Sequence, residues 1–259
     1  MAVTHPLAQT DAFSLTGVGF SFGLVSLALA DISVAAHTGR LTVILGQNGA
    51  GKSVLLSLLA GLRKPTQGQV LFKGQDMAQV PAKALAAQVA WVPHQTSGGD
   101  FFSVREAVEM GRVSFDEPRA RVRTAAARAL ALFELTELAE AQLGTLSGGQ
   151  RRRVLFARAM AQLDGADGGV LLLDEPDANL DPAQAVFLFQ KLRLLVAQGL
   201  TVVAVVHDLH LASEFGDEAW LMRGGRLIAA GAAGEVLTAE RLSGVYGVRV
   251  GEGMGWKVG

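Results

Sequence analysis

The sequence predicts an α/β fold built around a parallel sheet, and three observations predict it. Several short apolar runs are continuous rather than alternating, which indicates strands that are buried on both faces. Helical patterns follow these runs, as in a parallel sheet whose connections are helices. A long stretch at about 104–163 is almost entirely helical in pattern and indicates a helical subdomain inserted into the core.

The first part of the chain is expected to supply most of the strands. Residues 13–22 and 27–34 are expected to form an antiparallel β subdomain ahead of the first central strand at 41–45. A glycine-rich turn ends that strand. The elements expected next are a helix at 52–62 and short strands at 71–73 and 90–92.

The helical insertion and the rest of the core come later in the chain. Within the insertion, helices are expected at 105–111, 118–132 and 148–162. The other two central strands are expected at 170–173 and 201–206, with a helix at 181–198 between them. Residues 219–230 resemble two strands joined by a glycine turn at 223–226.

The length of the chain limits the number of domains that it can form. A chain of 259 residues is long enough for one large domain and short for two independent ones. We expect a single domain over 1–259. The divisions expected within it are an α/β core at about 13–95 and 164–230, a helical subdomain at about 96–163 and a C-terminal tail at 231–259.

Several classes of protein are disfavoured by the composition. No apolar run approaches the roughly 20 residues of a membrane-spanning helix, and the start lacks the pattern of an export signal. There is no cysteine, which excludes disulfides and thiolate sites. With 23 basic and 24 acidic residues the net charge is −1, so no overall field favours nucleic acid or an anionic membrane surface.

The first motif lies between the strand at 41–45 and the helix that follows. It fits the phosphate-loop pattern, in which backbone N–H groups and a helix N-terminus converge on a triphosphate. The expected ligands of the phosphates are Gly46, Gln47, Asn48, Gly49, Ala50, Gly51, Lys52 and Ser53. Lys52 is expected to neutralise the β- and γ-phosphates, and Ser53 to ligate Mg²⁺. An accidental glycine turn is the weaker interpretation, because strand and helix are both in register.

The second motif is the carboxylate pair Asp174 and Glu175 at the end of the strand at 170–173. The carboxyl ends of parallel strands form the ligand-binding edge of such a sheet. Asp174 is expected to hold Mg²⁺ through water, and Glu175 to orient and deprotonate the attacking water. An acidic turn that caps the next helix is the alternative interpretation.

The third motif consists of Ser147, Gly148, Gly149 and Gln150, just before a predicted helix. Such residues can simply cap the helix, but they also make a second anion-binding N-terminus. A chain with one phosphate loop has no obvious second phosphate for it.

Together the three motifs resemble those of the ATP-binding-cassette (ABC) ATPases, and the resemblance covers nearly the whole chain. It implies a P-loop ATPase that binds ATP and Mg²⁺ and pairs head to tail with a second copy, so that Ser147 of one copy closes over the ATP of the other. It further implies that Gln95 senses Mg²⁺ and contacts the transporter, that Asp181 lies in a segment crossing the dimer, and that His207 contacts the γ-phosphate. Taken singly, Gln95 could be an ordinary loop residue, Asp181 a helix cap and His207 a structural histidine after a strand.

Several aromatic and charged residues outside the three motifs also have an interpretation. Phe22 is the candidate for stacking on adenine, with Phe20 as a close competitor and a core role as the alternative. The arginines at 151–153 are interpreted as a solvated helix face, and Asp177 as outside the catalytic roles. The histidines interpreted as incidental are His5, His37, His94 and His210.

Two segments narrow the subfamily by resemblance. Residues 101–112, and the tail at 236–242 with 245–248, look like those of importers for iron chelates, haem and cobalamin. This resemblance implies a subunit at the cytoplasmic face of the inner membrane, bound to integral-membrane permease subunits, served indirectly by a substrate-binding protein and without nucleic acid. Three alternatives stay open: a transporter ATPase for another small solute or metal ion, including an exporter; a soluble ABC ATPase acting on DNA or ribosomes; and a subunit that binds ATP without cleaving it.

Overall fold

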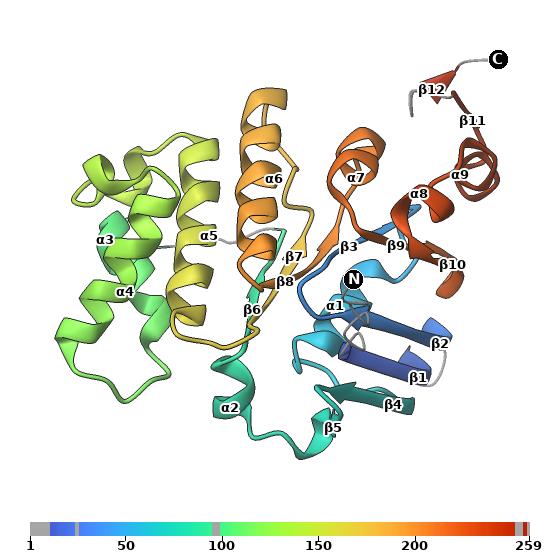
Figure 1. The fold of residues 1–259 in the computed structure, drawn as a ribbon, viewed down its shortest axis with the longest axis horizontal. Helices are drawn as coiled ribbons and strands as arrows, with labels where there is room; N and C mark the ends of the chain where they lie inside the picture. The colour runs from blue at the N-terminus through green and yellow to red at the C-terminus, as the bar shows by residue number, and fades with distance from the viewer. Residues whose placement is uncertain (1–10, 24–25, 95–98, 252–255, 258–259) are drawn as a thin grey trace, which may run out of the picture.

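The computed structural model describes residues 11–23, 26–94, 99–251 and 256–257, and its centre is a mostly parallel sheet (Figure 1). In the described chain this sheet has six strands in the order β10-β9-β3-β8-β7-β6. A second sheet of four strands has the order β2-β1-β4-β5, and β11 pairs with β12. The strands are β1 (Asp11–Phe22), β2 (Ser26–His37), β3 (Leu41–Gly46), β4 (Gln67–Phe72), β5 (Gln75–Asp76), β6 (Val89–Val92), β7 (Val170–Asp174), β8 (Thr201–Val205), β9 (Glu218–Arg223), β10 (Arg226–Ala232), β11 (Arg249–Val250) and β12 (Trp256–Lys257).

Helices flank the central sheet and fill the segment between β6 and β7. The α-helices are α1 (Lys52–Leu59), α2 (Ala82–Ala86), α3 (Val104–Glu109), α4 (Arg119–Leu132), α5 (Gly148–Leu163), α6 (Pro182–Ala197), α7 (Leu209–Phe215), α8 (Ala233–Val236) and α9 (Ala239–Tyr246). Short 3₁₀ turns are η1 (Met77–Gln79), η2 (Met110–Arg112), η3 (Thr136–Leu138) and η4 (Leu143–Thr145).

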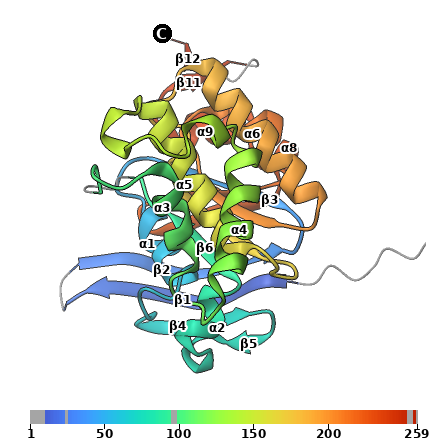
Figure 2. The same ribbon diagram turned by 90° about the vertical axis from the view of Figure 1, so that its left-hand side faces the viewer.

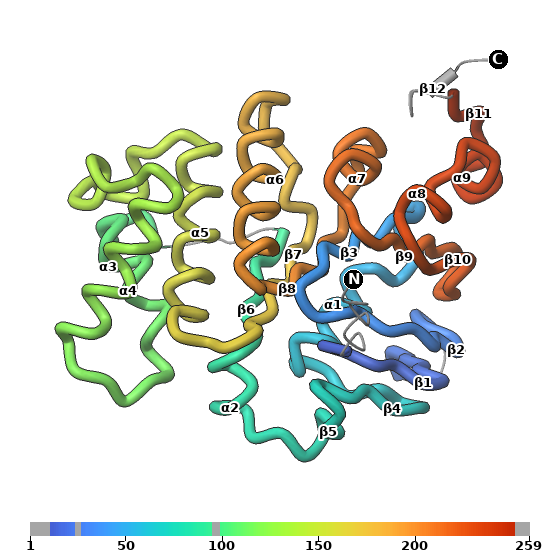
Figure 3. The backbone as a smooth tube through the Cα atoms, in the orientation of Figure 1, coloured from blue at the N-terminus to red at the C-terminus, as the bar shows by residue number. Residues whose placement is uncertain are grey.

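The three central strands confirm the prediction from continuous apolarity. Every residue of β3, β7 and β8 is buried, and β8 lies between the other two with parallel pairing on both sides. Strand β9 runs parallel to β3 on its other side, although residues 47–217 lie between them in the sequence, as the colours of the tube in Figure 3 show. The carboxyl ends of these strands therefore meet at one edge of the sheet.

The antiparallel elements were also predicted correctly. Strands β1 and β2 pair antiparallel, and β4 adds to the other side of β1. Strands β9 and β10 form the expected hairpin, whose turn is made by Gly224 and Gly225, both with positive φ. Figure 2 shows β1, β2 and β4 in the lower part of the molecule.

Helices α3, α4 and α5 pack together beside the parallel sheet, at the left of Figure 1 and facing the viewer in Figure 2. Phe133 and Phe156 stack between α4 and α5 with ring centroids 5.9 Å apart. The buried Arg112 donates to the carbonyls of Ala161, Gln162 and Asp164, and so satisfies carbonyl groups at the end of α5. None of the helices in the described ranges is long and apolar enough to span a bilayer.

Helix α1 is shorter than predicted. The pattern predicted a helix over 52–62, but α1 ends at Leu59 because Gly61 has a φ of +70° and cannot continue it. A Cβ at Gly61 would also lie 2.4 Å from Leu85 Cδ2. Four short helices, α2, α7, α8 and α9, were not predicted at all.

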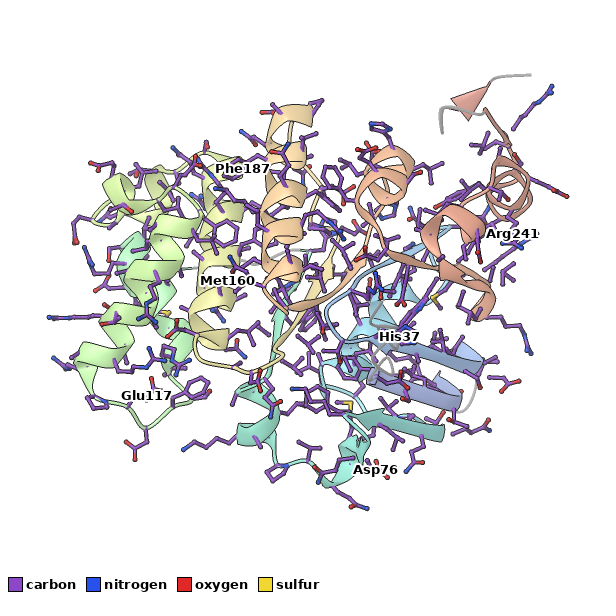
Figure 4. All side chains as sticks on the ribbon, in the orientation of Figure 1. His37, Asp76, Glu117, Met160, Phe187 and Arg241 are labelled. Carbon is purple, nitrogen blue, oxygen red and sulfur yellow. The ribbon has the colours of Figure 1, made fainter. Side chains whose placement is uncertain are left out.

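His37 was interpreted as incidental, and the structure corrects this. At the end of β2, its Nδ1 contacts Glu218 Oε1 on β9, and its Nε2 lies 3.7 Å from Asp11 Oδ1 on β1. Figure 4 labels His37 where the two sheets come together. The side chain therefore links the antiparallel sheet to the parallel one.

Candidate functional site

The phosphate-loop motif connects β3 to α1, as the sequence predicted. Three of its glycines have φ values that residues with a side chain rarely adopt: +150° at Gly46, +79° at Gly49 and +93° at Gly51. At Gly46 a Cβ would lie 2.2 Å from the carbonyl oxygen of Met222, and at Gly51 it would lie 2.6 Å from that of Ala28. Gly46 and Gly51 are therefore required twice over: their φ values are unfavourable for other residues, and a side chain there would clash with a neighbouring carbonyl.

Lys52 begins helix α1 and is buried. Its ammonium donates to the carbonyl oxygens of Gly46 at 2.8 Å and Gln47 at 3.1 Å. Burial lowers the pKa of Lys52, while the carboxylates of Glu175 and Asp174 act in the opposite direction. A phosphate in this loop would offer the ammonium charged partners in place of two neutral carbonyls.

Ser53 and Asp174 meet across the gap between α1 and β7. The Ser53 hydroxyl donates to Asp174 Oδ1 at 3.0 Å. Burial raises the pKa of Asp174, and the nearby Glu175 raises it further, whereas the Ser53 bond, His94 and Lys52 lower it. A hydroxyl and a carboxylate brought together in this way are oxygen donors of the kind that Mg²⁺ prefers.

Glu175 sits directly after β7 in a strained conformation, with a φ of +51°. Its N–H donates to the carbonyl of Val205 at 3.1 Å. His207 Nε2 lies 2.8 Å from Glu175 Oε1, so the structure brings together two residues that the sequence analysis singled out separately. Partial burial raises the pKa of Glu175, but the bond and charge of His207, with His94 and Lys52, outweigh burial and lower it. A lowered pKa keeps this carboxylate ionised at neutral pH.

His94 was interpreted as incidental, and the structure corrects this as well. Its Nδ1 lies 2.9 Å from Glu175 Oε2, on the oxygen that His207 does not use. His94 follows β6, which is the neighbour of β7 in the sheet, so its place after the strand brings it to the same edge. That strand-end position is the signal in the sequence that could have identified it.

Arg152 is not part of a solvated face. It is only 8% exposed, and its guanidinium donates to four carbonyls, those of Pro93, His94, Asp174 and Glu175, at 2.7–3.1 Å. Burial lowers its pKa, opposed by the nearby carboxylates. Helical periodicity puts Arg152 on the same face of α5 as the buried Gly149 and Phe156, and this could have indicated burial.

Asp177, which was interpreted as outside the catalytic roles, contacts the backbone beside the site. Its Oδ2 accepts from the backbone N–H groups of His207 at 3.4 Å and Asp208 at 3.3 Å. Asp208 in turn caps α7 by accepting from His210 and Leu211. Asp177 therefore holds the backbone that carries His207.

The third motif begins helix α5. Ser147 caps the helix and forms a capping box with Gln150, so the ordinary structural interpretation of these two residues is met. Ser147 and Gly148 are exposed, while Gly149 is buried and packs against the Gln184 side chain of α6. Asp181 likewise caps α6, ahead of Pro182.

The remaining predicted residues are placed as follows. Phe20 is 8% exposed and Phe22 is 45% exposed, and the two rings meet edge to face with Arg63 beside both. Phe22 is therefore the more accessible of the two rings. Gln95 lies outside the described residues.

One contact with the phosphate loop comes from the far end of the chain and was not predicted. The N–H of Gly46 donates to the Tyr246 hydroxyl at 3.2 Å, and the Gln47 side chain donates to the Tyr246 carbonyl at 3.1 Å. The last residue of α9 is thus bound to the beginning of the phosphate loop.

The chain is similar to proteins of a known family. The family model described as ABC transporter matches residues 29–178. Among curated relatives, a hemin import ATP-binding protein, HmuV, of Pseudomonas entomophila is 39% identical over 226 residues, covering 87% of this chain and 89% of its own. A cobalamin import ATP-binding protein, BtuD, of Halobacterium salinarum is 38% identical, covering 87% of this chain and 56% of its own.

The fold has close counterparts among solved structures. A metal-chelate type ABC transporter in an inward-facing conformation aligns with a TM-score of 0.79 and 29% identity, over 92% of this chain and 90% of that one. The family match spans more than half of the sequence and contains the phosphate loop, Ser147 and the Asp174–Glu175 pair. The chain therefore belongs to the ABC transporter family and is one of its ATPases.

Proposed function

We propose that this chain hydrolyses ATP to energise the uptake of an iron chelate, haem or cobalamin across the cytoplasmic membrane, at whose cytoplasmic face it binds permease subunits. The observation that carries the proposal is the gathering of Lys52, Asp174 and Glu175 around one phosphate loop in a chain 39% identical to a hemin import protein. Within the chain, we propose that 96–163 form the subdomain facing the permease, between core segments at 13–95 and 164–230.

The proposed chemistry is the in-line hydrolysis of ATP. The oxygen of a water attacks the γ-phosphorus, the bond to the β–γ bridging oxygen breaks, and a water proton passes to the Glu175 carboxylate. The products are ADP and inorganic phosphate. The loop from Gly46 to Ser53 holds the phosphates, Lys52 neutralises their charge and His207 fixes Glu175 while contacting the γ-phosphate. Phe22 stacks on the adenine.

The residues present fit a magnesium ion. Ser53 and Asp174 already place a hydroxyl and a carboxylate 3.0 Å apart, and a cation there would offset the burial of Asp174. Gln95 is the third proposed residue for this ion. When bound, Mg²⁺ would neutralise charge that develops on the phosphate oxygens.

The third motif, at the start of α5, is proposed to complete the site of a second copy. Ser147 and Gly148 would present a helix N-terminus to the partner's ATP, and Asp181 would lie in the segment that crosses between the copies. Two ATP molecules would then hold two chains together until hydrolysis. A shift from 1:99 to 99:1 between open and closed states requires a differential of about 5.5 kcal/mol, a total to which charge-assisted phosphate contacts from both chains contribute.

Gly148→Asp tests this pairing. Nothing lies within 4 Å of a Cβ at Gly148, so the variant should fold and bind ATP like the wild type. The added carboxylate should repel the partner's γ-phosphate, so ATP-dependent dimerisation and phosphate release should fall at least tenfold, about 1.4 kcal/mol or more. Sedimentation velocity with ATP and a phosphate-release assay measure the two effects.

Gly234→Asp is the matched control, because Gly234 on α8 is also exposed and has open space around its Cβ. It should dimerise and turn over normally. Full activity of Gly148→Asp would contradict the proposed pairing.

Uptake itself is tested with the permease and the substrate-binding protein. The complex should be captured from membranes with this chain and reconstituted in vesicles loaded with ATP. We expect uptake of haem, cobalamin or a ferric siderophore, and none when Glu175→Gln replaces the wild type. Transport of a different solute or metal ion would favour the first alternative, and failure to capture any membrane protein would favour a soluble ABC ATPase.

A further inference from the structure

The carboxylate of Glu175 has a histidine at each of its two oxygens. His207 Nε2 lies 2.8 Å from Oε1, and His94 Nδ1 lies 2.9 Å from Oε2. An ionised carboxylate accepts hydrogen bonds but donates none, so each of these nitrogens can bond to it only as an N–H donor. His207 already has a proposed part in hydrolysis, whereas His94 has none.

The Arg152 guanidinium binds the backbone of both His94 and Glu175. One end of the Arg152 guanidinium donates to the carbonyls of Pro93 and His94, and the other end donates to those of Asp174 and Glu175. Arg152 is buried, and carbonyl contacts to a buried guanidinium are among the stronger hydrogen bonds. The backbone at His94 and the backbone at Glu175 are therefore held by the same planar guanidinium group.

We propose that His94 is a positioning residue for ATP hydrolysis, which holds the Glu175 carboxylate in the orientation that accepts the proton of the attacking water. The inference rests on the proposed role of Glu175 as the base. A carboxylate has about four lone-pair sites, so two contacts with histidine leave room for a water. With both oxygens held, the carboxylate cannot rotate away from that water.

Loss of His94 should affect the chemical step rather than the binding of ATP. His94 faces the carboxylate, while Lys52 and the loop glycines surround the expected phosphate position. Without His94, one carboxylate oxygen loses its partner and the group can turn. Small misplacements of a reacting group lower rates by on the order of tenfold to a hundredfold.

The test compares two substitutions of nearly equal size. His94→Asn keeps an N–H donor near the position of Nδ1, and His94→Leu removes it. With the full chain and Mg²⁺–ATP, single-turnover phosphate release should be on the order of tenfold to a hundredfold slower in His94→Leu. His94→Asn should recover most of that rate, and both variants should keep the ATP dissociation constant of the wild type. His210→Leu, at an exposed histidine on α7, is the control and should be fully active.

Two outcomes would overturn the proposal: a wild-type rate in His94→Leu, or a rate in His94→Asn as low as in His94→Leu when both melt at the wild-type temperature. If His94→Leu does not fold, His94→Ser replaces it, because serine is polar but too short to reach Glu175. Glu175→Gln separates this inference from the proposed function. Normal turnover in Glu175→Gln would refute the base itself, whereas an inactive Glu175→Gln beside a fully active His94→Leu would refute only the role of His94.

Discussion

Glu175→Gln should slow ATP hydrolysis by about 10²–10⁴-fold while ATP binding is retained, because the amide keeps the shape of the side chain but cannot take a proton from water. The lowered pKa of Glu175 leaves the wild-type group ionised and available as a base. Since hydrolysis is what separates the proposed dimer, the variant should also accumulate as a closed, ATP-bound pair. Single-turnover phosphate release measures the first effect, and sedimentation velocity the second.

Glu214→Gln is a suitable control, because Glu214 is exposed on α7. It should turn over and dimerise like the wild type. Near-normal hydrolysis by Glu175→Gln would refute the assignment of the base. Slow hydrolysis without a stable dimer would retain the base and refute the two-copy clamp.

Lys52→Met should abolish ATP turnover and weaken ATP binding by about tenfold to a hundredfold, because a hydrogen bond to a charged group contributes about 1.5–3 kcal/mol. Methionine keeps the apolar stem but has no charge for the β- and γ-phosphates. In the structure the Lys52 ammonium is buried with a lowered pKa, so removing it should not destabilise the nucleotide-free fold severely. Isothermal titration with ATP and a chemical denaturation curve separate the two properties.

Lys83→Met is the matched control, since Lys83 is exposed on α2. Its affinity for ATP and its turnover should equal those of the wild type. Unchanged ATPase kinetics in Lys52→Met would remove the phosphate-loop role. A large loss of stability, with ATP affinity retained, would instead make Lys52 a structural residue.

The sequence was sufficient for features whose signals are local. The central strands β3, β7 and β8 are continuous apolar runs, and the phosphate loop and the Asp174–Glu175 pair stand directly at their ends. The predicted end of α1 was wrong because Gly61 stops the helix. Its positive φ and its close packing on Leu85 both prevent continuation, and a periodic pattern of apolar residues shows neither of these features. Short helices such as α2 and α8 have too few turns to show a period.

The supporting residues of the site could not be identified in this way, because their roles arise from contacts distant in sequence. Arg152 reaches Pro93 and His94 across 59 and 58 residues, and Asp177 reaches His207 across 30. Arginine and histidine side chains are often found at the protein surface, so residue type alone favoured a surface position without a role in the site. Only the fold shows that the ends of β6 and β7 meet beneath α5.

The bond between Gly46 and Tyr246 has a consequence for biosynthesis. The two residues are 200 positions apart. At about 5–20 residues per second, a ribosome needs roughly 10–40 s to extend the nascent chain from one to the other. The amide of Gly46 can bond to its phenolic acceptor only after this interval, so a nascent chain that still lacks α9 has a phosphate loop without this contact.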